Sequence, residues 1–537
     1  MQFYLKDSGY IWASWVTAEP FLCLKRYMKF MDYIIVQAGG KGTRLKYLTE
    51  NKPKALVPVD NLPMLFHLFR KYPDKKYVII ADYKKEVMRE YLDVFADVKY
   101  NIVDASGTGT CSGVKQAINL IPENEPFMLV WSDLILTEGL VLPEGYENDD
   151  VNPKKDYVGV SQTFPCRWKF ENGELSEERS TEYGVAGFFL FTDKSKIADV
   201  PESGELVRWM RDKGIKYEPI GLAGTREFGL IEEYEKLENS KCRPFNKITI
   251  QGKILTKEPV DAQGERLAKR ECAWYEKAKD LGIEILPKIY ETSPLKMEFV
   301  KGKNIYECDL ELEQKRSILN SLVDSLKKLH ESEKLPADTF SVKEAYFNKT
   351  FDRLAKIQDL IPFGRDEFIT VNGRKCRNVY YHRRELEKAL DRLVENCKDF
   401  AFIHGDCTFS NMMVRESGEP VLIDPRGYFG FSELYGDVRY DWAKVYYSIA
   451  GNYDQFNLKR FRLHISDNPE EGVQLDIESN HWEELADEFL KMTGQDEYEI
   501  KLLHAVIWLS LTTYAWQDYD SVCGAFYNGI YYLEEVL

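Results

Sequence analysis

The chain has 537 residues, enough for roughly two to four domains with sizeable cores. Hydrophobic residues make up 44% of it and charged residues 30%, as in an ordinary globular protein. A net charge of −16 argues against nucleic acid or an anionic membrane as partner, and no apolar run is long enough for a transmembrane helix. The ten cysteines contain no C-x-x-C pair, so we expect neither a zinc site nor a disulfide framework, and a cytoplasmic location.

Residues 1–31 carry Trp12, Trp15 and internal methionines, without the charged-then-apolar order of a secretory signal. We interpret them as an N-terminal extension of unknown role. A docking arm and an upstream start codon both explain such an extension, and the sequence leaves both open.

Residues 33–36 form a short apolar run, which predicts a buried strand, and the run breaks into a glycine-rich loop. Glycines let the backbone approach an anion closely, and their N–H groups can form an anion-binding nest. Lys52 and Lys54 follow, so we expect several cations around one triphosphate. The loop consists of Ala38, Gly39, Gly40, Lys41, Gly42, Thr43 and Arg44.

This loop fits neither of two familiar phosphate loops. In a Walker A loop the lysine precedes Ser or Thr, whereas Lys41 precedes Gly42. In the dinucleotide fingerprint a third glycine is needed, and Leu45 occupies that position.

The following residues alternate between predicted helices and strands, which indicates a parallel sheet with crossover helices. A second loop of small residues, 104–117, could accommodate a flat nucleobase at Gly107, Thr108 and Gly109, or could be a flexible connection. Asp133 follows the apolar strand 126–130, where a carboxylate could bind Mg²⁺ or cap the next helix. The helices are expected at 61–71 and 84–95, and the strands at 76–81 and 98–103.

With Lys52-Pro53-Lys54, the glycine loop closely resembles the signature of nucleotidyltransferases that make NDP-sugars and CDP-alcohols. The resemblance implies a Rossmann-like, GT-A-like α/β domain over residues 32–240. It further implies that an acceptor phosphate attacks the α-phosphorus of an NTP. Arg44 and the loop amides would then hold pyrophosphate, Lys54 would lie between α-phosphate and acceptor, and Asp133 would bind Mg²⁺.

Other parts of this family's site transfer less directly. The strand 183–191 resembles the one beneath the acceptor, and Lys169 is a candidate contact to the acceptor phosphate. Relatives place a second metal-binding Asp near the end of the domain. Here Glu227 occupies the comparable position, with the same charge and a longer side chain.

The pattern changes at about residue 241. Residues 247–255 alternate as a hairpin around Gly252, Lys257 ends the second strand, and Glu271 lies on a helix predicted at 264–281. A strand at 295–300 and an amphipathic helix at 311–333 come next.

Two motifs stand later in this half, FIHGDCTFSNMMV at 402–414 and VLIDPRG at 421–427. Asp406, Asn411 and Asp424 have the spacing of a kinase catalytic loop and its following metal-binding Asp. This half, 242–537, resembles the aminoglycoside phosphotransferase and choline kinase family.

The resemblance implies a bilobal, protein-kinase-like α+β domain with lobes at 241–301 and 302–537. Asp406 would be the catalytic base, and Asn411 and Asp424 would hold Mg²⁺. Lys257 would contact the ATP phosphates and pair with Glu271. Asp437 and Asp441, behind the catalytic loop, would be structural.

The last helices are aromatic and contain acids. Trp508 and Trp516, with Asp518 and Asp520, would suit a quaternary ammonium acceptor, or would form a core helix with surface acids.

We therefore expect a bifunctional enzyme that phosphorylates a small alcohol with ATP and then transfers a nucleotidyl group to the product. The resemblance favours choline and CTP, as in the decoration of surface polysaccharides. The alternative hypothesis is a sugar-1-kinase fused to a sugar nucleotidyltransferase. A third hypothesis is a chain in which one half is catalytically inactive and regulatory. Partners would be small molecules, and homo-oligomerisation stays open.

Overall fold

The structure is a computed structural model that describes residues 31–147, 153–237 and 246–537. These residues form two compact units. The first contains the described residues up to Gln37, in Asp74–Ile80 and in Val98–Arg226, and the second contains Ala38–Pro73, Ala81–Asp97 and the described residues from Glu227 onward. The predicted N-terminal extension, except its last residue, and the change of pattern at about 241 lie outside the described residues.

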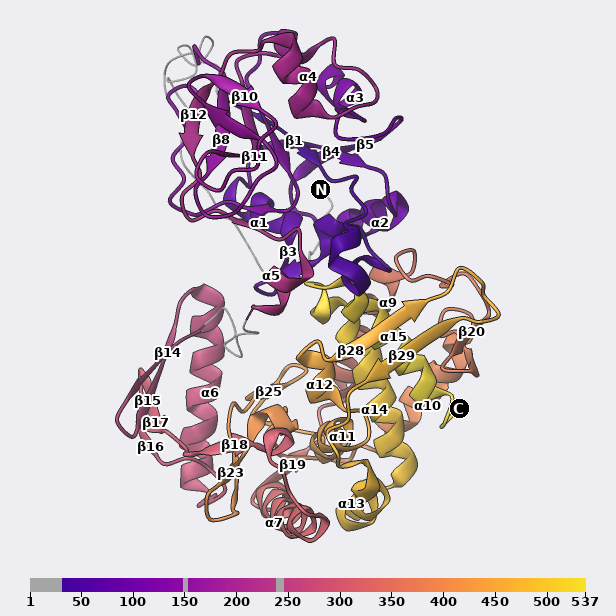
Figure 1. Ribbon diagram of the computed structural model, residues 1–537. Coiled ribbons are helices and arrows are strands. Elements are labelled where there is room, and N and C mark those ends of the chain that lie inside the picture. Colours follow the sequence, from indigo (N-terminus) through magenta and orange to yellow (C-terminus); the bar gives the residue numbers. More distant parts are fainter. Residues whose placement is uncertain (1–30, 148–152, 238–245) are drawn as a thin grey trace, which may run out of the picture. The chain divides into compact units, whose positions relative to one another are not determined.

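A nine-stranded sheet forms the centre of the first unit (Figure 1). Its β1 (Tyr33–Gln37) runs parallel to both β4 (Lys76–Ala81) and β6 (Phe127–Trp131), with Ile35 opposite Val78 and Leu129. The α/β prediction with a parallel core is therefore confirmed. The full path is β10 (Glu174–Ser176), β9 (Lys169–Glu171), β11 (Gly184–Phe191), β6, β1, β4 and β5 (Lys99–Asp104), while β8 (Tyr157–Ser161) pairs with β11 and with β12 (Glu218–Gly221).

Two helices cover one face of this sheet. The helices α3 (Val114–Asn119) and α4 (Leu206–Lys213) share one hydrophobic core with the central strands. The Glu205 side chain accepts the first free N–H groups of α4, and Gly214 ends the helix in the left-handed conformation. The core continues into the antiparallel part of the sheet through Val158, Val185, Phe189 and Phe191.

The second unit includes the glycine loop and the short helices after it. The chain forms 3₁₀ helices at Thr43–Thr49 and Lys54–Leu56, then a hairpin, then α1 (Met64–Lys71). The helix predicted from residue 61 begins later, because Asp60 and Asn61 both have positive φ and close a tight turn between the hairpin strands. The helix α2 (Lys85–Phe95) has the predicted length within one residue.

A four-stranded antiparallel sheet and one long helix also belong to the second unit. The order is β14 (Asn246–Gln251), β15 (Ile254–Pro259), β17 (Leu295–Glu298) and β16 (Ile289–Thr292). Gly252 turns the predicted hairpin with φ +63°. The helix α6 (Ala262–Asp280), capped by Asp261, lies along this sheet (Figure 1).

The rest of the second unit is mainly helical, as in the large lobe of a kinase-like domain. The helix α14 (Glu497–Leu511) packs between α11 (Val438–Ile449) and α15 (Tyr519–Leu533), and α7 (Leu312–Glu331) ends near the predicted boundaries. A small sheet of β18 (Gly302–Asn304), β23 (Met412–Arg415) and β24 (Pro420–Leu422) carries the two predicted motifs.

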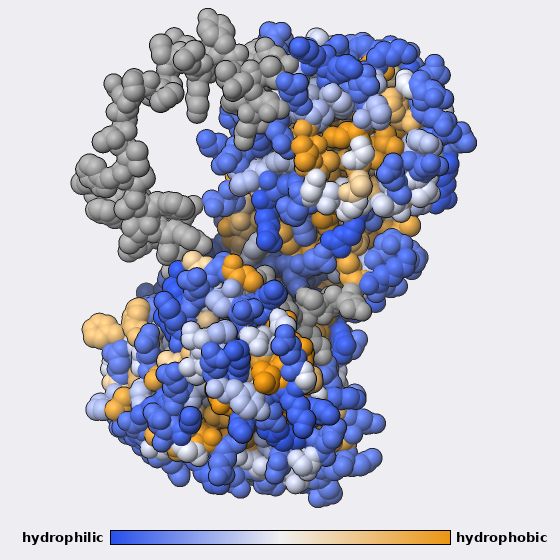
Figure 2. Space-filling model, turned by 90° about the vertical axis from the view of Figure 1, so that its left-hand side faces the viewer, coloured by the Kyte–Doolittle hydropathy of each residue, from blue (hydrophilic) through white to orange (hydrophobic). Residues whose placement is uncertain are grey.

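Hydrophilic residues cover most of the face in Figure 2, and the exposed hydrophobic residues gather in separate patches. Within the described residues, every helix is too short or too polar to cross a lipid bilayer.

Candidate active sites

The segment 404–406 is held from behind by a buried carboxylate. Asp441 Oδ2 accepts the His404 N–H at 2.9 Å, and Asp441 Oδ1 accepts the Gly405 N–H at 2.7 Å. Burial opposes ionisation, but the hydrogen bond and charge of His330, 3.0 Å away, lower the pKa of Asp441. Asp441 is therefore an anchor that fixes the loop backbone next to Asp406.

Asp406 lies between an amide and an ammonium group. The Asn411 Nδ2 donates to the Asp406 Oδ2 and to its backbone oxygen, both at 2.9 Å. Lys444 Nζ lies 3.0 Å from Asp406 Oδ1. This arrangement holds the carboxylate in one orientation, as a base that receives a hydroxyl proton requires.

The three remaining predicted kinase residues meet at one point. Lys257 Nζ lies 2.7 Å from Glu271 Oε2 and 2.9 Å from Asp424 Oδ1. Although burial opposes it, Asp424 and Glu271 raise the pKa of Lys257, so the ammonium is charged. Asp424, with φ +54°, follows Ile423, whose backbone oxygen contacts His404 Nε2 at 3.0 Å. The Asp424 segment and the catalytic loop are therefore hydrogen-bonded to each other.

The donor set here fits Mg²⁺ bound together with a nucleotide. Both amide protons of Asn411 point at Asp406, so its Oδ1 is the atom left for a metal, and Asp424 supplies carboxylate oxygens. Among the described residues, no three or more His, Cys, Asp or Glu side chains form a group that could hold a metal. Mg²⁺ usually takes one or two carboxylates and completes its shell with phosphates and water, so a small protein donor set suits it.

In the second unit, the structure brings Lys54 to the glycine loop. Gly42 has φ +67°, and a Cβ at Gly42 would lie 3.0 Å from Lys54 Cβ and 3.3 Å from its Cγ and Cδ. Gly39 is close to Asp82, whereas a Cβ at Gly40 would meet no atom within 4 Å. The Lys41 ammonium lies 5.2 Å from the centre of the Tyr83 ring. Gly42 is therefore the position where a glycine is needed for both backbone conformation and packing.

Arg44 and Glu227 lie beside the same glycine of the second unit. A Cβ at Gly229 would fall 2.1 Å from Glu227 Oε1 and 3.4 Å from Arg44 Nη2. The predicted pyrophosphate-binding cation and the predicted substitute for the second metal-binding Asp therefore lie near each other.

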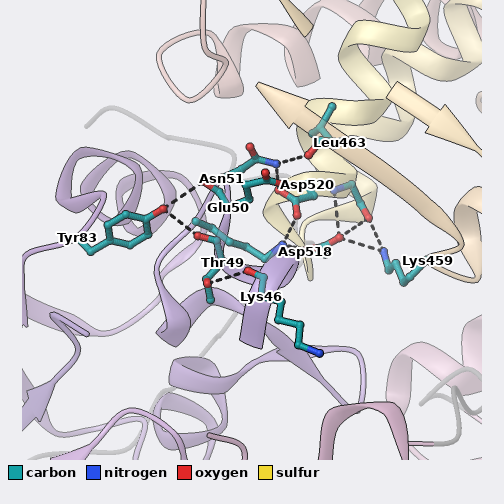
Figure 3. A network of polar contacts seen from close by, with 11 residues as sticks. Lys46, Thr49, Glu50, Asn51, Tyr83, Lys459, Leu463, Asp518 and Asp520 are labelled. Carbon is teal, nitrogen blue, oxygen red and sulfur yellow. Dashed lines mark hydrogen bonds and ion pairs between the residues drawn. The ribbon is translucent and has the colours of Figure 1, made fainter. Parts of the chain in front are cut away.

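Lys52 does not join these cations, and that expectation is wrong. Its Nζ lies 3.0 Å from Asp518 Oδ1 and 2.5 Å from Asp520 Oδ2, and 2% of its side chain is exposed. Asn51 donates to Asp520 as well, and Lys459 approaches Asp518 (Figure 3). Two buried carboxylates occupy the Lys52 ammonium, which leaves it no free face for a triphosphate.

The predicted base-binding loop and Asp133 belong to the first unit. Asp133 follows β6 and directly precedes β7 (Leu134–Ile135). The loop glycines Gly107 and Gly109 approach the backbone of residues 202–204, where a Cβ would come within 1.9 and 2.4 Å of carbonyl oxygens. Thr108 takes part through its N–H, which donates to Ser203 Oγ at 3.0 Å. Close packing against residues 202–204 therefore explains why glycines stand at these positions, without any nucleobase.

Three candidate acceptor residues are occupied by other contacts. Lys169, also in the first unit, is paired with Glu171 at 2.7 Å. Trp508 is completely buried, and its Nε1 donates to His504 Nε2 at 2.9 Å. Trp516 packs on Phe66 and Phe95. The core interpretation of the last helices fits this packing. The acids predicted at the surface are wrong, because the Asp518 side chain is 5% exposed and the Asp520 side chain 15%.

Sequence reasoning missed Lys444, which belongs to the site. A signal was available, because Lys444 stands three residues after Asp441 on one helix, so both face the same side. Arg426 was also missed, although it lies in the DPRG motif.

Comparisons with known proteins match a family model to part of each half. Residues 33–142 match the nucleotidyl transferase family, and residues 263–464 match the phosphotransferase enzyme family. These two matches agree with the fused architecture that the two resemblances predict.

Relatives of known name resemble parts of the chain. A UTP–glucose-1-phosphate uridylyltransferase of Haloferax volcanii is 47% identical over 177 residues, which are 32% of this chain and 65% of that protein. A D-glycero-α-D-manno-heptose 1-phosphate guanylyltransferase of Campylobacter jejuni is 31% identical over 100 residues, 18% of this chain and 45% of that one. The chain thus covers less than two thirds of either relative.

Solved structures also match part of the chain. The inositol-1-phosphate CTP transferase of T. maritima is 15% identical with a TM-score of 0.32, covering 38% of this chain and 93% of its own. The CTP:phosphocholine cytidylyltransferase of Streptococcus pneumoniae is 19% identical with a TM-score of 0.29, covering 39% and 97%. The strand order of the nine-stranded sheet and the two family matches support the fold class.

Proposed function

We propose that the chain is a bifunctional enzyme that activates a small acceptor in two steps. The C-terminal half phosphorylates a hydroxyl of the acceptor with ATP. The N-terminal half then transfers a nucleotidyl group from a second NTP to the new phosphate, and pyrophosphate leaves. Such a product is a donor for surface polysaccharide synthesis.

The observation that carries the proposal is the geometry around Asp406. Asn411 and Lys444 orient this carboxylate, and hydrogen bonds tie its loop to the Asp424 segment, where Lys257 lies. In the proposed step the acceptor oxygen attacks the γ-phosphorus of ATP, the bond to ADP breaks, and Asp406 receives the hydroxyl proton. Lys257, paired with Glu271, would contact the ATP phosphates. Mg²⁺, held by Asn411 and Asp424, would offset the charge of these phosphates.

The nucleotidyl transfer needs positioning and charge neutralisation rather than a covalent intermediate. Arg44 and the amides of residues 38–43 would hold the departing pyrophosphate. Lys54, whose stem lies on Gly42, would reach the α-phosphate. Asp133 and Glu227 are the proposed carboxylate ligands of a second Mg²⁺, and the 107–108 segment is the proposed contact to the base.

Two acceptor classes compete. Choline with CTP rests on the family resemblance and on the aromatic C-terminal helices, and the packing of Trp508 and Trp516 weakens the second argument. A sugar as acceptor, giving an NDP-sugar, gains support from relatives named for glucose 1-phosphate and heptose 1-phosphate. We favour the sugar class, with the base of the second NTP open.

Two variants test the division of labour. Asp406→Asn should abolish phosphorylation of the free acceptor and leave nucleotidyl transfer to a pre-phosphorylated acceptor intact. Asp133→Ala should do the reverse. Both activities are measured by mass spectrometry with ATP, the other NTPs and a panel of sugars, polyols and amino alcohols. Loss of both activities in either folded variant would contradict the two-site proposal, and Mg·NTP titration of each variant would show whether one half is a regulatory domain that binds no nucleotide.

A further inference from the structure

A group of basic side chains near Asp406 is left unexplained by the proposed chemistry. Lys349 and Arg353 lie one turn apart on α9 (Lys349–Ile357), and Arg426 follows Asp424 by two residues. Arg353 donates to the Ser510 backbone oxygen, and Arg426 donates to Tyr440 and Tyr428 hydroxyls at 3.0 and 2.9 Å. Within the described part of the chain, none of these three cations forms an ion pair with a carboxylate.

Arg426 lies directly against the catalytic loop. Its backbone N–H donates to the His404 oxygen at 2.9 Å, and its Cβ lies 3.0 Å from where a Cβ on Gly405 would stand. Its neighbour in the loop is Asp406, which is already paired with Lys444 at 3.0 Å. The basic group therefore adjoins the atom that would receive the acceptor's proton.

Ring packing brings this group together, because Tyr440, whose hydroxyl accepts from Arg426, lies 6.2 Å from the ring of Tyr346, three residues before Lys349. The charges are close enough to perturb one another. Burial lowers the pKa of Lys349 well below its ordinary value, and Arg426, Arg353 and Lys444 lower it further. Burial and then Arg426 likewise lower the pKa of Arg353. Two carboxylates act on these four cations, namely Asp406, which is paired with Lys444, and Glu344. An excess of like charges away from water costs free energy.

Other buried cations of the second unit are compensated. Lys52 contacts two carboxylates, and Arg439 contacts Asp437 at 2.6 Å and Glu499 at 2.8 Å. Against this background, the group at Lys349, Arg353 and Arg426 has fewer carboxylates beside it than cations. An unbalanced set of charges beside a catalytic loop is characteristic of a ligand site.

We propose that Lys349, Arg353 and Arg426 form an anion-binding subsite for the kinase acceptor, so that the acceptor is an alcohol that already carries a phosphate or carboxylate group. The inference rests on the proposed kinase function of Asp406. The anionic group would bind the three cations and hold the hydroxyl at Asp406. An acceptor with a quaternary ammonium group would be repelled at the same place, so the subsite also separates the competing acceptor classes.

The test compares matched alcohols that differ in charge. The full-length enzyme is assayed for ATP-dependent phosphorylation of glycerol, glycerate and glycerol phosphate, of glucose and glucose 6-phosphate, and of choline. We expect a kcat/KM for the anionic member of at least one series about tenfold or more above its neutral parent, as one good charged contact supplies. Glycerate and glycerol phosphate distinguish a carboxylate from a phosphate. Equal or better use of choline or of the neutral alcohols would overturn the proposal.

The variant Lys349→Met tests whether the three cations bind the acceptor or ATP. It should raise the acceptor KM about tenfold and leave the ATP KM unchanged, whereas Lys343→Met, at an exposed position on α8 (Thr339–Lys343), should change neither. A rise in the ATP KM alone would mean that the cations serve the nucleotide and would overturn the subsite.

A binding measurement keeps the subsite independent of catalysis. Glycerate, glycerol phosphate and inorganic phosphate are each added to the wild type and to Lys349→Met without ATP, and Tm is recorded. Stabilisation of the wild type that the variant loses supports the subsite, even in a chain that phosphorylates nothing and so fails the kinase proposal. Equal shifts in both proteins, or none in either, would overturn it.

Discussion

Lys52 Nζ lies 3.0 Å from Asp518 Oδ1, in a contact where 2% and 5% of the two side chains are exposed. Asp518 is also the cap of α15, since its carboxylate accepts the N–H of Ser521 (Figure 3). The lysine that begins Lys-Pro-Lys therefore holds a helix start far along the chain. The lysine that ends the motif lies on Gly42. Two lysines separated by one proline thus have different environments and, we infer, different tasks.

Replacing Lys52 by methionine should destabilise the second unit. The variant leaves Asp518 and Asp520 buried beside each other without their nearest cation, and breaking a buried ion pair on one side costs about 3–5 kcal/mol. Urea unfolding followed by tryptophan fluorescence measures the effect. Adding Asp520→Asn should recover part of the loss, because the uncompensated charge is removed.

A different outcome would restore Lys52 to the nucleotide. If Lys52→Met unfolds like the wild type but loses nucleotidyl transfer, the ammonium acts on phosphate and not on α15. Lys54→Met is the matched comparison, since we expect it to lose transfer while its stability changes little.

Gly42 and Gly40 offer a matched pair within the glycine loop. Gly42→Ala should lower nucleotidyl transfer strongly, because φ +67° strains alanine and the new Cβ presses on Lys54. Gly40→Ala finds free space and should leave the folded state unchanged. Titration with Mg·NTP and thermal unfolding of both variants separate the two effects. Loss of NTP binding in stable Gly40→Ala would show that nucleotide fills that space; equal behaviour of both variants would contradict the special position of Gly42.

Glu271 should matter for ATP and not for the acceptor. Glu271→Gln keeps a hydrogen-bond acceptor for Lys257 but removes the charge, so Lys257 should shift toward Asp424 and the ATP KM should rise about tenfold. Steady-state kinetics with varied ATP measures it. Glu276→Gln on the same helix, whose amide oxygen can still accept the Thr292 hydroxyl, should behave like the wild type. An unchanged ATP KM in Glu271→Gln would remove this pair from the proposed site.

Much of the site could be predicted because its signals are local. The glycine loop after its strand is a pattern within one short segment. The same holds for Asp406 and Asn411, which stand five residues apart and whose side chains are hydrogen-bonded. The Lys257–Glu271 pair could also be predicted from the sequence, since a hairpin and the helix that follows it pack against each other.

The parts that sequence reasoning missed depend on contacts between distant segments. Local charge and spacing placed Lys52 at the triphosphate. They could not reveal Asp518, more than 400 residues away in the sequence, whose carboxylate binds the Lys52 ammonium instead. Trp508 had two interpretations, because the sequence of an aromatic helix is similar whether the helix lies in a core or lines a ligand site. Burial among Tyr447, Phe456 and His504 favours the core reading.

His504 predicts a pH dependence of stability. It is buried against Tyr446, Tyr447 and Tyr532, and its Nε2 accepts the Trp508 N–H, so the ring is neutral in the folded chain. Burial lowers the pKa of His504 from 6.5 to about 3. His504 therefore binds a proton near pH 6.5 in the unfolded chain but only near pH 3 in the folded chain. Because the unfolded chain binds more protons between these two values, the free energy of unfolding falls as the pH is lowered from 6.5 to 3.

His504→Gln should remove that contribution. Its amide oxygen can still accept the Trp508 N–H, so the variant is expected to fold, with some loss of stability at pH 7. Between pH 7 and pH 5 the wild type should lose about 1–2 kcal/mol more than the variant, since each pH unit within the window is worth about 1.4 kcal/mol. Urea unfolding at several pH values measures the difference. An equal slope in His504→Gln would mean that His504 takes up its proton as readily in the folded chain as in the unfolded chain.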